Sequence, residues 1–120
     1  MRVLVCGGRD YRDARRIFFE LDSVRNTFGL TVLIHGAAPG VDRIAGQWAA
    51  KHGIPVEDFP ADWFPHGKDG GRDDGAGPKR NARMLAEGRP DLVVAFPGAS
   101  GTNDMIERAR AAGIRVMEIR

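Results

Sequence analysis

The sequence of 120 residues is poor in several residue types, and each shortage excludes a class of protein. A single cysteine, Cys6, cannot form an internal disulfide bond, so we expect a reducing, cytoplasmic location rather than a disulfide-rich secreted scaffold. No apolar run is long enough to cross a membrane, and the opening MRVLVCGG is too short and too soon broken for a signal peptide. Aromatic residues make up only 8% of the chain, which leaves few candidates for stacking on nucleic-acid bases.

A strong excess of charge of one sign is also lacking, because 18 basic residues against 16 acidic ones leave a net charge of +2. This modest charge argues against a nucleic acid as the partner, and we expect a small-molecule ligand instead. Among the basic residues, 15 are arginine and only 3 are lysine. The skew has two explanations, a GC-rich genome or planar guanidinium recognition of phosphate and carboxylate groups.

Apolar strand-like runs alternate with helix-like stretches along the whole chain. Strands are predicted at residues 3–6, 30–34, 54 onward, 91–96 and 114–119. Helices are predicted at 13–28, from 41 to a cap at Gly53, at 78–87 and at 102–112. This alternation predicts one doubly wound α/β domain over residues 1–120, Rossmann-like, with a five-stranded, mainly parallel sheet. Residues 60–77 carry no periodic pattern and predict a long loop, although Trp63 and Phe64 indicate that its first part packs on the protein.

Three of the predicted strand-to-helix loops consist of glycine and other small residues. They read GGRDY at 7–11, HGAAPGVD at 35–42 and PGASGT at 97–102, whereas the turns at the opposite end of the sheet carry one glycine each. Ligands of doubly wound sheets bind beyond the carboxyl ends of the strands, where small residues leave backbone N–H groups free to face an anion. The candidate ligand-binding residues are Gly7, Gly8, Arg9, Gly36, Gly40, Asp42, Lys79, Asn81, Pro97, Gly98, Ser100, Gly101 and Thr102.

The last of these loops allows two interpretations. In the first, its amides and the first turn of the following helix bind an anion, and Thr102 either caps that helix or bonds a phosphate oxygen. In the second, Gly98 and Gly101 only supply turn dihedral angles and Thr102 is an ordinary N-cap. The clustering of three such loops at one edge of the sheet favours the first.

Neither of the common phosphate-binding motifs is present. The chain has no GxxxxGK[ST], which disfavours P-loop hydrolysis of Mg-ATP, and no GxGxxG after the first strand, so we expect no dinucleotide cofactor. A mononucleotide or a similar phosphorylated compound fits better. His66, Asp69, Asp73 and Asp74 lack any recognisable ligand spacing, so we expect no metal site.

Several charged candidates also have ordinary structural explanations. Asp42 either contacts the ligand or complements the dipole of the helix that it begins, and Arg9 either binds phosphate or pairs with Asp10 or Asp13. His35 follows an apolar strand, which is typical of an interior histidine whose hydrogen bonds are satisfied.

A basic cluster begins the third predicted helix. The positive end of the helix dipole disfavours cations at this position, which holds Lys79, Arg80 and Arg83. An anionic partner would offset this repulsion. The alternative is a solvated charged face.

Four runs, CGGRDY, HGAAPGVDRIAGQWA, GPKRNARML and FPGASGT, occur in the order in which they are found in a known group. The chain resembles the YspA-related proteins of the Rossmann-like SLOG superfamily over nearly its full length. GASGT also resembles the PGGxGTxxE signature of the LOG phosphoribohydrolases, and RNARM is similar to their RKAxM stretch. The DNA-processing protein DprA carries a related domain. The resemblance implies nucleotide binding and, because LOG proteins commonly dimerise, a homo-oligomer.

The resemblance to the LOG proteins also implies roles for individual residues. Arg80 matches the arginine that contacts the substrate, and the phosphate-binding loop matches Pro97, Gly98, Gly101 and Thr102. The LOG catalytic glutamate, however, falls on Met105, whose position on an apolar stripe is typical of a core residue. Cleavage of an N-glycosidic bond needs a carboxylate near the sugar, which methionine cannot supply.

Three functions follow as alternatives. In the first, the chain binds a nucleoside 5′-monophosphate and hydrolyses it to base and ribose 5-phosphate, with Arg80 and Asp104 as catalytic residues and Asp10 or Asp42 as substitutes for Asp104. In the second, it is a non-catalytic module that senses a nucleotide. In the third, which we favour least, it binds single-stranded nucleic acid, with Trp63, Phe64 and Tyr11 as the stacking candidates.

Overall fold

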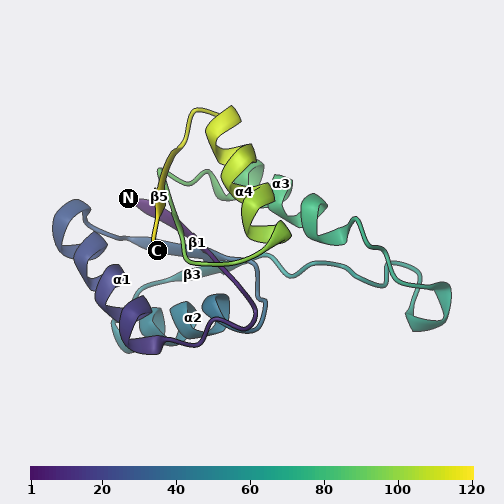
Figure 1. The fold of residues 1–120 in the computed structure, drawn as a ribbon, viewed down its shortest axis with the longest axis horizontal. Helices are drawn as coiled ribbons and strands as arrows, with labels where there is room; N and C mark the ends of the chain where they lie inside the picture. The colour runs from purple at the N-terminus through teal and green to yellow at the C-terminus, as the bar shows by residue number, and fades with distance from the viewer.

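The computed structural model describes residues 1–120, and strands alternate with helices along the whole chain (Figure 1). The elements are β1 (Arg2–Cys6), α1 (Ala14–Phe28), β2 (Val32–His35), α2 (Val41–Lys51), β3 (Val56–Asp58), the 3₁₀ turn η1 (Lys68–Gly70), α3 (Ala76–Gly88), β4 (Leu92–Ala95), α4 (Ser100–Ala111) and β5 (Arg115–Glu118). No helix is both long enough and apolar enough to cross a membrane.

The five strands form one parallel sheet in the order β3-β2-β1-β4-β5. Leu4 at the centre of β1 pairs with Ile34 of β2 on one side and with Val93 of β4 on the other. The chain therefore moves outward from β1 through β2 to β3, and then crosses back to place β4 on the far side of β1. The α/β prediction of a five-stranded parallel, doubly wound sheet is confirmed, and the strand order reverses between β1 and β4.

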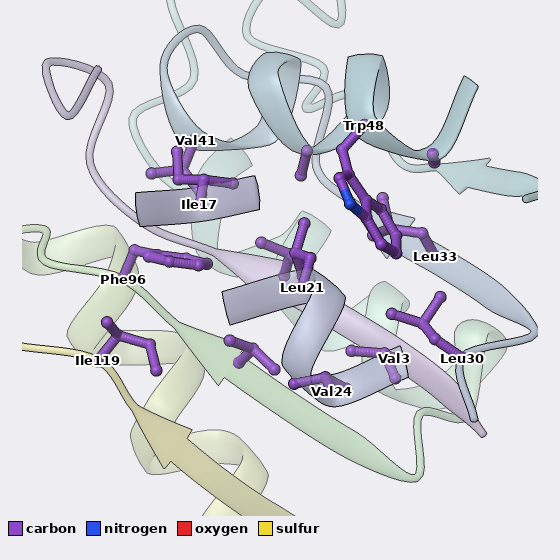
Figure 2. Packing of buried hydrophobic residues seen from close by; sticks show 14 of the residues in the cluster. Val3, Ile17, Leu21, Val24, Leu30, Leu33, Val41, Trp48, Phe96 and Ile119 are labelled. Carbon is purple, nitrogen blue, oxygen red and sulfur yellow. The ribbon is translucent and has the colours of Figure 1, made fainter. Parts of the chain in front are cut away.

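Two helices cover each face of the sheet. Ile17, Leu21 and Val24 recur at helical spacing in α1 and are buried with the α2 side chains against one face. Figure 2 shows Trp48 pointing from α2 toward Leu33 of the sheet. The other face carries a second cluster, to which α3 and α4 contribute Met84, Met105, Ile106 and Ala109. Because both faces are covered, the central strands are continuous apolar runs without polar alternation.

The predicted helix boundaries are accurate to within about two residues, and one difference matters for the site. We expected the last helix to begin at residue 102, with Thr102 as a possible N-cap, but α4 begins at Ser100 after the N-cap Ala99. Thr102 is therefore the third residue of the helix, and its side chain is buried. The N-cap interpretation of Thr102 is wrong, because the helix begins two residues earlier, at Ser100, although the preceding glycines had indicated a turn there.

The segment between β3 and α3, which we call the arm (residues 60–75), extends away from the rest of the protein (Figure 1). Its tip carries η1, and the last two residues of the predicted loop, Ala76 and Gly77, already belong to α3. The two aromatic residues of the arm differ. Trp63 packs near Gly77 and lies close to the guanidinium groups of Arg9 and Arg72, whereas the side chain of Phe64 is exposed.

Candidate functional site

The three loops that follow β1, β2 and β4, which we call the rim loops (residues 7–11, 36–40 and 97–102), contact one another. The Gly8 N–H donates to the carbonyl of Pro97 at 2.9 Å, and the carbonyl of Gly8 accepts from the Val41 N–H at 3.3 Å. The loops thus meet beside the point where strand order reverses, the place where doubly wound sheets bind ligands.

Glycine is required in the rim loops because their backbones approach so closely. A Cβ on Gly98 would lie 2.8 Å from the Cβ of Thr102 and 2.9 Å from the Gly8 nitrogen, closer than real side chains approach. Gly40 has a φ of +80°, and a Cβ there would lie 2.5 Å from the carbonyl oxygen of Arg9. Gly101 differs, since nothing lies within 4 Å of its Cβ position. Most of the rim glycines therefore allow loop contact, which the sequence interpretation did not anticipate.

The backbone amides of residues 98–102, which we call the 98–102 amides, donate no hydrogen bond within the protein. They occupy the N-cap region and first turn of α4, where no side chain caps the helix. Residues 97–101 are exposed and Thr102 is buried, so the free donors of residues 98–101 lie at the protein surface. A row of free N–H groups at a helix N-terminus carries a partial positive charge and suits a phosphate or carboxylate group.

A polar network joins the rim to α3 and α4. Arg80 donates from Nη1 to the carbonyl of Gly36 at 2.5 Å and from Nε to the side-chain oxygen of Asn81 at 3.0 Å. Asn81 in turn donates to the carbonyl of Gly101 at 3.1 Å and to Asp104 at 3.0 Å. The network fixes α3 against two rim loops, and it leaves Nη2 of Arg80 without a hydrogen bond.

The two positions that bear on catalysis lie on different faces of α4. Met105 is fully buried in the core cluster of α3 and α4, so it cannot act on a ligand. Asp104 is partly exposed and accepts hydrogen bonds from Asn81 and from Arg108 Nε, the latter at 2.8 Å. Its charge is therefore already balanced within the protein.

The remaining basic candidates also have partners within the chain. Lys79 pairs with Asp73 at 2.8 Å, and Arg83 pairs with Glu87 at 3.1 Å. Acidic residues of the same chain therefore already balance the charges of two members of the basic cluster on α3. Arg9 pairs with neither of the acidic residues that follow it, and its guanidinium lies 5.3 Å from the ring centre of Trp63. That stacking was missed from the sequence, because a contact across 54 positions leaves no local signal.

A hollow of about 370 Å³, which we call the basic hollow, lies between the arm and α3. Lys79, Arg80 and Arg83 line it together with His66 and Asp62. Arg80 therefore connects the basic hollow to the rim loops. His66 and the aspartates of the arm do not gather into a group that could hold a metal ion.

Asp42 is nearly enclosed beneath the rim and braces the loop after β2. Its carboxylate accepts hydrogen bonds from the backbone N–H groups of Gly36 and Ala38, at 3.1 and 3.2 Å. Burial raises the pKa of Asp42, and these two hydrogen bonds and the nearby His35 oppose the rise. Asp42 thus lies in the first turn of α2, as expected, but its contacts are with the loop. Burial likewise raises the pKa of Cys6 to about 12, so its thiol stays protonated at neutral pH.

His35 makes stability depend on pH. Burial lowers its pKa, an effect that Arg80 adds to and that Asp42 and Asp58 oppose. Between that lowered pKa and the unfolded value near 6.5, the unfolded chain binds a proton that the folded chain does not, so the free energy of unfolding falls as pH drops below about 6.5. We expect His35→Gln to remove a slope of at most about 1.4 kcal/mol per pH unit, measured by urea unfolding from pH 7.5 to 5.

The control for this measurement is His66→Gln, because His66 is exposed on the arm. It is expected to keep the pH dependence of the parent protein. An unchanged slope in His35→Gln would show that another group causes the loss of stability.

Comparisons with known proteins agree with this architecture. The "Gene 61 protein" of Mycobacterium phage D29 is 38% identical over 125 residues, which cover 97% of this chain and 94% of that protein. The crystal structure of DNA processing protein A (DprA) from Streptococcus pneumoniae superposes with a TM-score of 0.75 at 22% identity over 98% of this chain. This chain corresponds to only 50% of the DprA chain, so the likeness establishes the fold alone.

The match to a family model covers the part of the chain that holds two of the three rim loops. The model describes the "YspA, cpYpsA-related SLOG family" and matches residues 1–66. The resemblance inferred from the four ordered runs is therefore confirmed, and the chain belongs to the YspA, cpYpsA-related SLOG family.

Proposed function

We propose that this protein binds a nucleotide or a related phosphorylated small molecule at the carboxyl ends of β1, β2 and β4. The observation that carries the proposal is the run of 98–102 amides, which have no acceptor within the protein and of which four, at residues 98–101, belong to exposed residues. Membership of the SLOG family supports a role with nucleotides or nucleic acids. The phosphate group would accept hydrogen bonds from these amides and gain from the dipole of α4.

Arg80 is the side chain best placed to add to this binding. Its Nε and Nη1 are held by Asn81 and Gly36, which orients the guanidinium, and its Nη2 is free beside the basic hollow. An oriented guanidinium loses little side-chain entropy when it binds phosphate. Lys79 and Arg83 line the same hollow, but Asp73 and Glu87 already pair with them, so Arg80 is the basic side chain on which the proposal depends. The homo-oligomer that the resemblance implies stays a prediction.

Binding without cleavage is the function that the geometry supports best. Hydrolysis of an N-glycosidic bond needs a carboxylate free to stabilise the developing positive charge, and Asp104 is paired with Arg108 while Met105 is buried. Hydrolysis remains the second candidate. The side chain of Asn81 donates to both Asp104 and the carbonyl of Gly101, so the Asp104 carboxylate lies near the rim loops. Release of free base from AMP distinguishes the two.

Single-stranded nucleic acid is the third candidate. DprA is named as a DNA processing protein, and the arm of this chain carries Trp63 and the exposed Phe64. Trp63, however, is already stacked by Arg9 and Arg72, at 5.3 and 4.6 Å from its ring centre. A single exposed aromatic side chain is a weak platform for successive bases.

The test compares AMP with adenosine, since the two differ only in the phosphate. We expect AMP at a hundred times its Kd to stabilise the protein by about 2.7 kcal/mol, and adenosine to give a much smaller thermal shift. Arg80→Ala is expected to reduce the AMP shift, and Arg89→Ala, an exposed position at the far end of α3, to retain it.

The same samples are assayed for free adenine and mixed with an unstructured oligonucleotide. Binding of AMP without adenine release supports the proposal, and adenine release converts it to hydrolysis. Equal stabilisation by adenosine and AMP would contradict the proposed phosphate site, and tight oligonucleotide binding that weakens steeply with salt would favour the nucleic-acid candidate.

A further inference from the structure

A second hollow, of about 400 Å³, lies beside α2, on the opposite side of the sheet from α3 and α4. We call it the His35 hollow. It is lined by His35 at the end of β2, by Ala37 and Ala38 of the loop that follows, and by Arg43, Gly46 and Gln47 of α2. None of the 98–102 amides belongs to it, so it is separate from the proposed phosphate site.

The hydrogen bond that His35 makes fixes which ring nitrogen carries the proton. The backbone N–H of Ala37 donates to Nδ1 at 2.9 Å, so Nδ1 is the acceptor and the neutral ring carries its proton on Nε2. Burial lowers the pKa of His35, which keeps the ring neutral at pH 7 and above.

The Nε2–H group faces the hollow without a partner. It lies beside Gly46, whose Cβ position is 3.2 Å from Nε2, and no hydrogen bond is made by Nε2. His35 is only 9% exposed. Every polar side-chain atom that is sealed from solvent has a hydrogen-bond partner, so the unpartnered Nε2 of His35 is in contact with solvent. A buried donor therefore opens toward solvent through the hollow, and a donor in this position favours an acceptor on a ligand.

The other lining groups indicate what kind of acceptor fits. Arg43 is exposed and forms no ion pair, so its planar guanidinium is available at the edge of the hollow, with the Gln47 side chain one turn along α2. A guanidinium favours an anion with two oxygens in a plane. Asp42 and Asp58 act electrostatically on His35, and they disfavour a doubly charged phosphate more than a singly charged carboxylate.

We propose that the His35 hollow binds the carboxylate group of a small molecule, with the Nε2–H of His35 and the guanidinium of Arg43 as its donors. The small side chains of Ala37, Ala38 and Gly46 leave the room that such a ligand needs. This site shares the rim loop of residues 36–40 with the proposed nucleotide site, but its donors are different, because it uses neither the 98–102 amides nor Arg80.

The test is an NMR titration of the intact protein at pH 7.5 with sodium acetate, followed at the ring nitrogens of His35. We expect the free protein to show the Nε2–H tautomer, and acetate to move the Nε2 resonance in a saturating manner. Sodium chloride at matched ionic strength should leave that resonance in place, and inorganic phosphate should move it less than acetate does. A proton on Nδ1, or an Nε2 resonance that acetate does not move, would overturn the proposal.

A matched pair of variants locates the site. Arg43→Ala and Lys51→Ala each remove one positive charge from an exposed position of α2, but only Arg43 lines the hollow. Arg43→Ala loses a hydrogen bond to a charged group, so we expect its acetate affinity to be about tenfold weaker. We expect Lys51→Ala to leave the acetate affinity unchanged. Equal affinities in the two variants would overturn the proposal, whatever the outcome of the AMP titration.

Discussion

Gly98→Ala is expected to weaken AMP binding by about a hundredfold, because two charge-assisted hydrogen bonds to the phosphate would be lost. A Cβ at residue 98 would lie 2.8 Å from the Thr102 Cβ and 2.9 Å from the Gly8 nitrogen, so the loop must move away from both. Because Thr102 lies in the first turn of α4, this movement displaces the 98–102 amides from their common orientation. Isothermal titration of AMP measures the change, and urea unfolding measures an accompanying loss of about 1–3 kcal/mol of stability.

The same loop provides the control. Gly101→Ala adds the same methyl group three residues later, where no atom lies within 4 Å of the Cβ position, and it keeps the backbone N–H. We expect AMP affinity and stability close to those of the parent protein. Equal affinities in the two variants would show that the geometry of this loop does not determine nucleotide binding.

Trp48→Ala is expected to have the largest effect on stability, a loss of about 3–5 kcal/mol. Trp48 is fully buried between α2 and the sheet, so truncation leaves a cavity (Figure 2). It also removes the hydrogen bond that the indole N–H donates to Asp22 at 2.8 Å. Urea unfolding at pH 7.5 gives the free energy of unfolding. Phe19→Ala is the control, because Phe19 is 65% exposed and its loss is expected to change stability by less than about 0.5 kcal/mol.

A loss below about 1 kcal/mol in Trp48→Ala would contradict the packing of α2 described above. A collapse of the neighbouring side chains into the space left by the indole could reduce the loss, but not to the value of a surface substitution.

The fold could be predicted because its signals are local. Continuous apolar runs such as Leu92–Ala95 alternate with helical stripes such as Ile17, Leu21 and Val24, and parallel strands joined by helices allow few arrangements. Pro55 cannot donate to a strand ladder, which is typical of an edge strand, and β3 does lie at the edge of the sheet. The start of α4 was less accurate, because glycine and serine occur both in turns and in the first turn of a helix.

The candidate site could be predicted only in part. The meeting of the three rim loops follows from parallel topology, which brings the carboxyl ends of β1, β2 and β4 to one edge. The side-chain partners do not follow, since the Arg80–Gly36 and Asn81–Asp104 hydrogen bonds join distant segments. The stacking of Arg9 on Trp63 depends on the path of the arm, and no periodic pattern in residues 60–75 encodes it.

The most direct test of the central claim is a titration of ¹⁵N-labelled protein with AMP, followed at the backbone amides of residues 98–102. If these free N–H groups bind the phosphate, their resonances shift together and saturate with the Kd that calorimetry gives, while adenosine leaves them in place. Binding of AMP that shifts other regions and leaves the 98–102 amides unchanged would contradict the account.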